Sequence, residues 1–145
     1  MKKGDWRKTH GFSLMELLIV LAIMGMLAAL VGPKLFGKVD EGKQKSTKAQ
    51  IELFGTALDS FRLDVGRYPT TEEGLKALRE KVSGADGWKG PYTAKEIPSD
   101  AWGKPFVYKC PGDHGDYDLF SYGADGSEGG EGMNQDIVSW ADLKK

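Results

Sequence analysis

The chain has 145 residues, of which 40% are hydrophobic and 28% are charged, and its formal net charge is -1. That small total conceals an asymmetry, because residues 1–11 carry four basic side chains and one acidic one, whereas residues 32–145 carry 16 basic and 19 acidic ones. An acidic C-terminal part argues against nucleic-acid binding as the main task. The single cysteine, Cys110, excludes a disulfide within the chain.

A long apolar segment follows the basic leader. Counted strictly, the uncharged run 17–31 has 15 residues, about 22 Å of helix, but counted from Phe12 to Phe36 it has 25 residues, about 37 Å, which is enough to span a bilayer. Basic residues flanking such a segment favour the cytoplasmic side. We therefore expect a transmembrane helix over 12–35, with the leader in the cytoplasm and the rest of the chain across the membrane.

Glu16 is the anomaly within this segment. An ionised carboxylate inside a membrane helix costs on the order of several kcal/mol and usually marks a function or a partner. Two alternatives are open. Glu16 can lie at the headgroup boundary and snorkel, or the segment can be a secretory signal that is cut near the small residues Ala28 and Ala29.

The run Gly11-Phe12-Ser13-Leu14-Met15-Glu16, behind a basic leader, resembles the class III signal of type IV pilins and pseudopilins. The resemblance implies that a prepilin peptidase cuts after Gly11, removing residues 1–11, and N-methylates Phe12. It also implies that Glu16 meets the terminal amine of a neighbouring subunit during assembly, since buried opposite charges are tolerable when paired. Within one chain, Glu16 can also reach back to its own terminus.

The helical pattern continues beyond the apolar segment. Apolar residues recur at spacings of 3, 4, 3 and 4 over 51–65, which predicts an amphipathic helix whose stripe packs against a globular head. Pro33 should loosen or kink this helix and give the filament a point of extension, and Gly66 suits its C-terminal end. We expect one helix from Phe12 to about Val65, of which 36–65 belongs to the head, 36–145.

Two further patterns follow the helix. Thr70 and Glu73 fit a capping box, which predicts a short helix burying Leu75, Leu78 and Val82. The aromatic residues between positions 84 and 105 are expected to cover a small core rather than to form a ligand platform. The segments 68–75 and 98–105 resemble the major pseudopilins of the type II secretion system.

Short strands are predicted at 106–108, 117–122 and 137–140. The expected fold class is therefore α+β, with a long N-terminal helix whose second half packs on a small antiparallel sheet, followed by a calcium-type loop near the C-terminus.

That loop, residues 122–136, contains five glycines, four carboxylates and two side-chain amides, but no lysine or arginine. Calcium takes six to eight oxygen ligands, and glycines let the backbone turn toward it. The spacing of acidic residues is not that of an EF-hand, and the composition alone favours a flexible, solvated acidic loop over a calcium site.

The resemblance to major pseudopilins implies one calcium ion in this loop, as a staple in place of a disulfide. By position, Asp125 and Asp136 supply carboxylates, and Tyr122 and Ser127 supply carbonyl oxygens. Gln135 stands where the family can have an aspartate, so Gln135, a neighbour such as Asn134 or Glu131, or water completes the ligand set.

No catalytic set is evident, and we expect the protein not to be an enzyme. His10 lies in the leader, and Cys110 and His114 lie in a Pro-Gly-Asp turn that gives them no orienting context as a thiol–imidazole pair. No phosphate-binding glycine loop or Cys/His metal spacing is present.

The resemblance implies a structural subunit that is anchored once in the inner membrane, has a periplasmic head, and is extracted into a homo-oligomeric helical filament that drives export of folded proteins. Minor pseudopilins, prepilin peptidase and an inner-membrane assembly platform are the implied partners. A type IV pilin for adhesion, motility or DNA uptake is the main alternative. A membrane-anchored calcium-dependent binding module without a filament is a second one, and a membrane-anchored hydrolase is the most distant.

Overall fold

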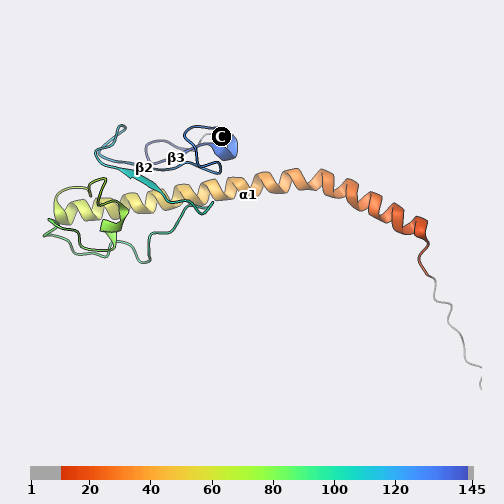
Figure 1. Cartoon of the computed structure of the whole chain (residues 1–145), viewed down its shortest axis with the longest axis horizontal. Helices are drawn as coiled ribbons and strands as arrows, with labels where there is room; N and C mark the ends of the chain where they lie inside the picture. Colours follow the sequence, from red (N-terminus) through yellow and green to blue (C-terminus); the bar gives the residue numbers. More distant parts are fainter. Residues whose placement is uncertain (1–10, 144–145) are drawn as a thin grey trace, which may run out of the picture. The chain divides into compact units, whose positions relative to one another are not determined.

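The computed structural model describes residues 11–143. The chain divides into two compact units between Lys38 and Val39. The helix α1 (Leu14–Val65) contributes to both, and the strands β2 and β3 lie along its second half (Figure 1).

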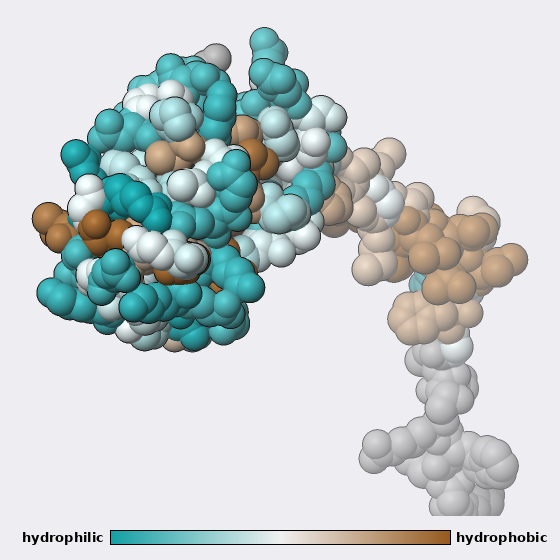
Figure 2. Space-filling model, turned by 60° about the vertical axis from the view of Figure 1, so that its left-hand side comes forward, coloured by the Kyte–Doolittle hydropathy of each residue, from teal (hydrophilic) through white to brown (hydrophobic). Residues whose placement is uncertain are grey.

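The first unit is the apolar part of α1. Among the described residues, α1 is the only helix that is long and apolar enough to cross a membrane, and none of its apolar window is buried within the protein. Its surface is largely hydrophobic, whereas the surface of the second unit is mostly hydrophilic with separate hydrophobic patches (Figure 2). The helix is continuous through Pro33, so the proline does not end it, and the expected kink stays a prediction.

The start of α1 is fixed by a capping box that the sequence analysis did not identify. The Ser13 hydroxyl accepts a hydrogen bond from the Met15 N–H at 3.1 Å. The Glu16 carboxylate accepts one from the Ser13 N–H at 2.8 Å. This S-x-x-E pattern satisfies N–H groups that a helix start leaves unpaired, so Glu16 reaches back to the helix start within one chain.

The second unit, the head, is built on the C-terminal half of α1. The predicted stripe is confirmed, since the helix buries four large or medium apolar side chains there, Ile51, Phe54, Leu58 and Phe61, and Val65 packs against them. Gly66 follows the helix with a φ of 85°, and its N–H donates to the Arg62 carbonyl at 2.8 Å. A left-handed residue at this position is the usual end of a helix.

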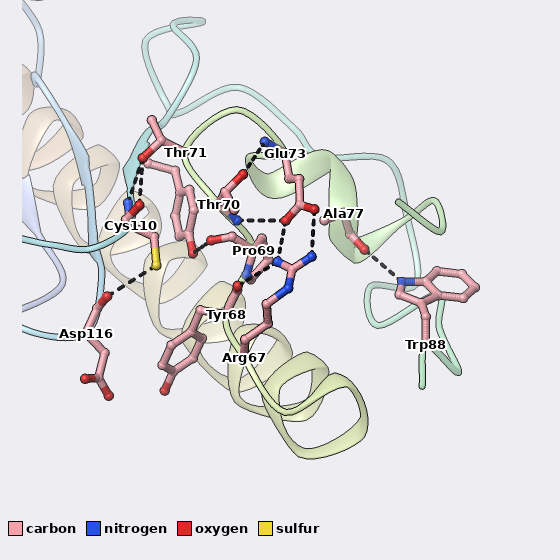
Figure 3. Close-up of polar contacts among 11 residues, drawn as sticks. Arg67, Tyr68, Pro69, Thr70, Thr71, Glu73, Ala77, Trp88, Cys110 and Asp116 are labelled. Atoms are coloured by element: carbon pink, nitrogen blue, oxygen red, sulfur yellow. Dashed lines mark hydrogen bonds and ion pairs between the residues drawn. The ribbon is translucent and has the colours of Figure 1, made fainter. Parts of the chain in front are cut away.

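The turn after α1 is held by the predicted capping box (Figure 3). The Thr70 N–H donates to the Glu73 carboxylate at 2.8 Å, and the Glu73 N–H donates to the Thr70 hydroxyl at 3.3 Å. Arg67 donates to both oxygens of Glu73, at 2.6 and 2.8 Å. Hydrogen bonds among Arg67, Thr70 and Glu73 thus hold this turn together outside the core.

The short helix expected after this box is present as a 3-10 helix, η1 (Leu75–Leu78). Gly74 precedes it with a φ of 57°, which interrupts the right-handed backbone that a regular helix starting at Thr70 would need. Leu75 and Leu78 are buried as predicted, whereas Val82 is only half-buried.

The predicted antiparallel sheet is confirmed. It has the order β1-β2-β3, with β1 at Val107–Lys109, β2 at Asp118–Ser121 and β3 at Ile137–Val138. Tyr108 pairs with Leu119, and Ser121 pairs with Ile137. The last strand is shorter than expected. A second 3-10 helix, η2 (Gly132–Asn134), lies in the loop before it.

The aromatic residues between 84 and 105 cover the core, as predicted. Trp88, Tyr92 and Trp102 all pack against the buried cluster, and the Trp88 indole donates to the Ala77 carbonyl at 2.9 Å. Tyr108 is buried with its hydroxyl donating to the Pro69 carbonyl at 2.8 Å, which joins the sheet to the turn after α1.

Candidate functional site

The acidic loop connects β2 to β3, and its two ends lie next to each other at the edge of the sheet. It starts after Ser121 and ends before Ile137, and these two residues are paired partners in β2 and β3. Gly123 has a φ of 66°, and a side-chain carbon at this position would lie 2.6 Å from the Gln135 carbonyl oxygen. Only glycine therefore lets the two ends of the loop approach this closely.

The two aspartates expected to bind calcium are each engaged locally. Asp125 is exposed, and its carboxylate accepts a hydrogen bond from the Ser127 N–H at 3.1 Å. One oxygen of Asp136 accepts a hydrogen bond from the Gly129 N–H at 2.9 Å. The described contacts do not join the two carboxylates to one another, and they order separate halves of the loop.

The second carboxylate oxygen of Asp136 is the distinctive atom of this loop. It is buried and has no hydrogen-bond partner among the described residues. A buried carboxylate oxygen without a partner is unfavourable, and a cation relieves it. Asp136 therefore fits the expected metal site on the geometry of its own side chain.

The remaining expected ligands lie at the loop ends. Tyr122 is half-buried, with its ring at 5.1 Å from that of Phe120, Ser127 is exposed, and Gln135 is half-buried. Within residues 11–143, no group of three or more His, Cys, Asp or Glu side chains is placed to hold a metal. A cation here would thus need backbone carbonyls in addition to the carboxylates.

A lysine from outside the loop reaches into it, which the sequence analysis missed. The Lys104 ammonium donates to the Ala124 carbonyl at 2.7 Å and to the Gly123 carbonyl at 3.4 Å. A side-chain carbon at Gly126 would lie 2.7 Å from this ammonium nitrogen, so the glycine provides the space that the lysine occupies. No spacing in the sequence indicates this contact, because it joins residues about twenty positions apart.

Two side chains of α1 hold the loop and the segment after it. The Gln44 amide donates to the Gly132 carbonyl. The Lys48 ammonium donates to the Val138 carbonyl at 2.8 Å and to the Ala141 carbonyl at 2.7 Å. Positions 44 and 48 lie one turn apart on the same helix face. The C-terminal part of the chain is therefore hydrogen-bonded to one face of α1.

His114 lies beside the loop but does not pair with Cys110. Its ring contacts the Asp118 carboxylate at 2.9 Å and stacks on Trp140 at 3.9 Å between ring centroids, in a pocket of about 190 Å³ that Glu128 and Asp136 also line. Burial favours a higher pKa for Asp118, but hydrogen bonds from the His114 ring and from backbone N–H groups hold its pKa below the usual range. The Cys110 thiol contacts the Asp116 carbonyl instead, at 3.4 Å.

The residues expected to be processed lie at the other end of the chain. Gly11 and Phe12 are exposed and precede α1, and Glu16 and Pro33 are exposed on the helix. Residues 1–10 of the leader, including His10, lie outside the described residues.

Comparisons with known families give two matches that together span most of the chain. Residues 34–140 match the family model "Type II secretion system (T2SS), protein G", and residues 6–32 match the "Prokaryotic N-terminal methylation motif".

Curated relatives are similar over almost their whole length. The type II secretion system core protein G of Pseudomonas aeruginosa is 41% identical, with 92% of this chain and 96% of the relative covered. The protein of the same name from Vibrio cholerae is 41% identical, over 97% of this chain and 96% of the relative. That of Escherichia coli K12 is 39% identical, with 95% of each chain covered.

A solved structure agrees with these matches. The crystal structure of the major pseudopilin from the type 2 secretion system of enterohaemorrhagic Escherichia coli aligns with a TM-score of 0.62 and 34% sequence identity. The alignment covers 74% of this chain and 95% of that one.

Proposed function

Because the chain belongs to the type II secretion system protein G family, and is thus a pseudopilus subunit anchored in the inner membrane, we propose that identical copies of it polymerise into a periplasmic helical filament whose growth exports folded proteins through the outer membrane. The observation that carries this proposal is the combination of the methylation motif over 6–32 with the family match over 34–140. A chain with both has a segment for storage in the membrane and a head for the filament.

The proposal includes the processing and the partners of the chain. Prepilin peptidase cuts after Gly11 and methylates Phe12, the leader stays in the cytoplasm, and the head lies in the periplasm. Minor pseudopilins and the inner-membrane assembly platform are its partners. The methylation motif supports the processing step, and the exposed position of Gly11 and Phe12 ahead of α1 is compatible with access by a peptidase.

The test of the filament uses Glu16, the carboxylate in the first turn of α1. In cells that lack their own copy of the gene, the chain should restore secretion and yield filaments that can be sheared from cells and pelleted. Glu16→Gln should enter the membrane in normal amounts but give at least tenfold fewer filaments, because the neutral side chain cannot pair with the amine of a neighbour. Membrane fractionation and pelleting measure both quantities.

Glu52→Gln is the matched control, since Glu52 is an exposed glutamate on the same helix within the head. It should assemble normally. Normal assembly of Glu16→Gln would contradict the proposed pairing, and unchanged secretion in cells that lack the chain would contradict the proposed function itself.

We also propose that the acidic loop binds one calcium ion. Asp125 and Asp136 would supply carboxylates, Tyr122 and Ser127 would supply carbonyl oxygens, and Gln135 would supply its side-chain oxygen. The buried, unpartnered oxygen of Asp136 supports this proposal. The ion would neutralise the carboxylates and hold the ends of the loop together.

Thermal unfolding of the detergent-solubilised chain tests the calcium site. A ligand that binds only the folded state stabilises it by about 2.7 kcal/mol at a hundredfold excess over its dissociation constant, which corresponds to roughly several degrees for a domain of this size. Calcium should raise the melting temperature relative to a chelator, and Asp136→Asn should abolish the difference. Glu128→Gln, which removes an exposed loop carboxylate outside the proposed ligand set, should preserve it. An equal melting temperature with calcium and with chelator would refute the site.

A further inference from the structure

Two large apolar side chains in the C-terminal part of α1, Leu53 and Leu63, are more exposed than Val39 at the start of the head. Leu63 is 86% exposed and Leu53 is 68% exposed, although both lie on the helix that forms the core. Such side chains on an otherwise hydrophilic head (Figure 2) are candidates for contact with another protein.

Leu53 forms part of a groove, whereas Leu63 does not. The groove has a volume of about 350 Å³ and lies between α1 and the segment 92–98. Most of the residues that line it are uncharged, among them Gln50, Leu53, Phe54, Tyr92, Ala94 and Pro98. The charged residues Lys95 and Glu96 complete the lining. It has room for an aliphatic side chain.

The two features lie on different faces of the helix. Leu63 is ten residues beyond Leu53, which places it about 15 Å further along the axis and about 80° around it. A contact between Leu63 of one copy and the groove of another can be reciprocated about a twofold axis. Where it is not reciprocated, it is heterologous, and it joins copies head to tail and continues indefinitely unless the rotation closes.

We propose that the groove of one copy receives Leu63 of a second copy in the filament. This inference rests on the proposed function, since it takes the second copy from the homopolymer. Copies anchored in one membrane run with their helices parallel. A closed dimer about a twofold axis normal to the membrane gives the two helices no axial offset, whereas this contact requires an offset of about 15 Å. The staggered contact therefore suits a helical filament.

The first experiment compares two variants in which an exposed apolar side chain is replaced by serine. Leu63→Ser should reduce the amount of pelleted filament at least fivefold and leave the melting temperature unchanged, because Leu63 is exposed in the single copy. Met133→Ser, which alters a 47% exposed side chain in the acidic loop, should leave both unchanged. Wild-type filament yield from Leu63→Ser would overturn the proposal.

The second arm locates the contact. In a Cys110→Ser background, which removes the single native cysteine, Leu63→Cys is combined with Ala94→Cys at the exposed rim of the groove. Filaments are oxidised with copper phenanthroline in air and separated on a non-reducing gel. The double variant should give a ladder of dimers, trimers and longer products, because each copy offers both thiols, whereas each single variant should not.

The outcomes separate this inference from the proposed function. Filaments of the double variant that give no ladder would overturn the Leu63 contact and leave the filament function standing. If the unsubstituted chain forms no filament although the cells contain the secretion system, the proposed function fails and the contact falls with it.

Discussion

Glu73 illustrates how one residue organises the turn after α1. Its carboxylate accepts two hydrogen bonds from Arg67 and one from the Thr70 N–H (Figure 3). Its side chain is only 17% exposed. The hydrogen bonds from Arg67 lower the pKa of Glu73 below its ordinary value, against the opposing effect of burial. The ionised form is therefore the form that the fold uses.

We predict that Glu73→Gln destabilises the head at pH 7 by about 1–3 kcal/mol, because charge-assisted hydrogen bonds are lost from a largely buried group. The pKa of Glu73 is lower in the folded state, so its contribution is present above the unfolded value of about 4.5 and disappears as the pH falls through the folded value. Urea unfolding at pH 7 and at pH 3 should thus show a smaller difference between variant and wild type at pH 3.

Glu72→Gln is the control for this prediction, since Glu72 is an exposed neighbour. It should change stability by less than about 0.5 kcal/mol at either pH. A difference between Glu73→Gln and wild type that is the same at both pH values would show that the ionised carboxylate is not what stabilises the turn.

At the scale of elements, the acidic loop is held by side chains that it does not contain. Lys104 reaches its first half, Gln44 reaches η2, and Lys48 reaches the strand and segment that follow. Each contact ends on a backbone carbonyl. The loop's own composition does not reveal these ties, since all the donors lie elsewhere in the chain.

We predict that Lys104→Met loosens the loop. The substitution removes the hydrogen bonds to the Gly123 and Ala124 carbonyls while keeping most of the side-chain volume, and it should cost about 1–2 kcal/mol of stability. Hydrogen exchange of the backbone N–H groups in 122–136 should accelerate severalfold, in calcium-free buffer so that a bound ion does not compensate. Lys81→Met, at an exposed site, should leave this exchange unchanged. Equal exchange in both variants would count against Lys104 as a support of the loop.

The elements were predictable where the sequence is periodic. The stripe from Ile51 to Val65 follows the helix repeat, and the strands combine aromatic and β-branched residues between turns. The short helix after Thr70 was predicted, but its 3-10 geometry was not, because the apolar pattern does not show that Gly74 changes the backbone there. The capping box of Ser13 and Glu16 has the S-x-x-E sequence pattern of a helix start. It was not predicted, because Glu16 was interpreted as a charge within an apolar segment.

The candidate loop residues were predictable from composition and resemblance, but their supports were not. Asp125 and Asp136 stand out as carboxylates in a glycine-rich loop. Lys48 contacts carbonyls 90 and 93 positions away, and such a contact depends on how the sheet folds back onto α1. No local pattern of side chains encodes a hydrogen bond to a distant backbone oxygen.

At the scale of the whole molecule, the chain combines an apolar segment exposed along its length with a head that has a core of its own. Under the proposed function, the apolar segment is stored in the membrane and then withdrawn from it. It would be covered by lipid before assembly and by neighbouring copies after it. The head keeps its own core in both environments.

The hydrogen bonds from Gln44 and Lys48 on α1 to the C-terminal part of the chain have a consequence for the conditions under which the head can fold. Ammonium and amide groups bond to carbonyls as soon as the chain folds, without an oxidant, a thiol-exchange enzyme or a particular redox potential. These contacts are therefore independent of the redox state of the compartment. At one calcium concentration, a head folded under reducing conditions should have the same tertiary structure as one folded under oxidising conditions.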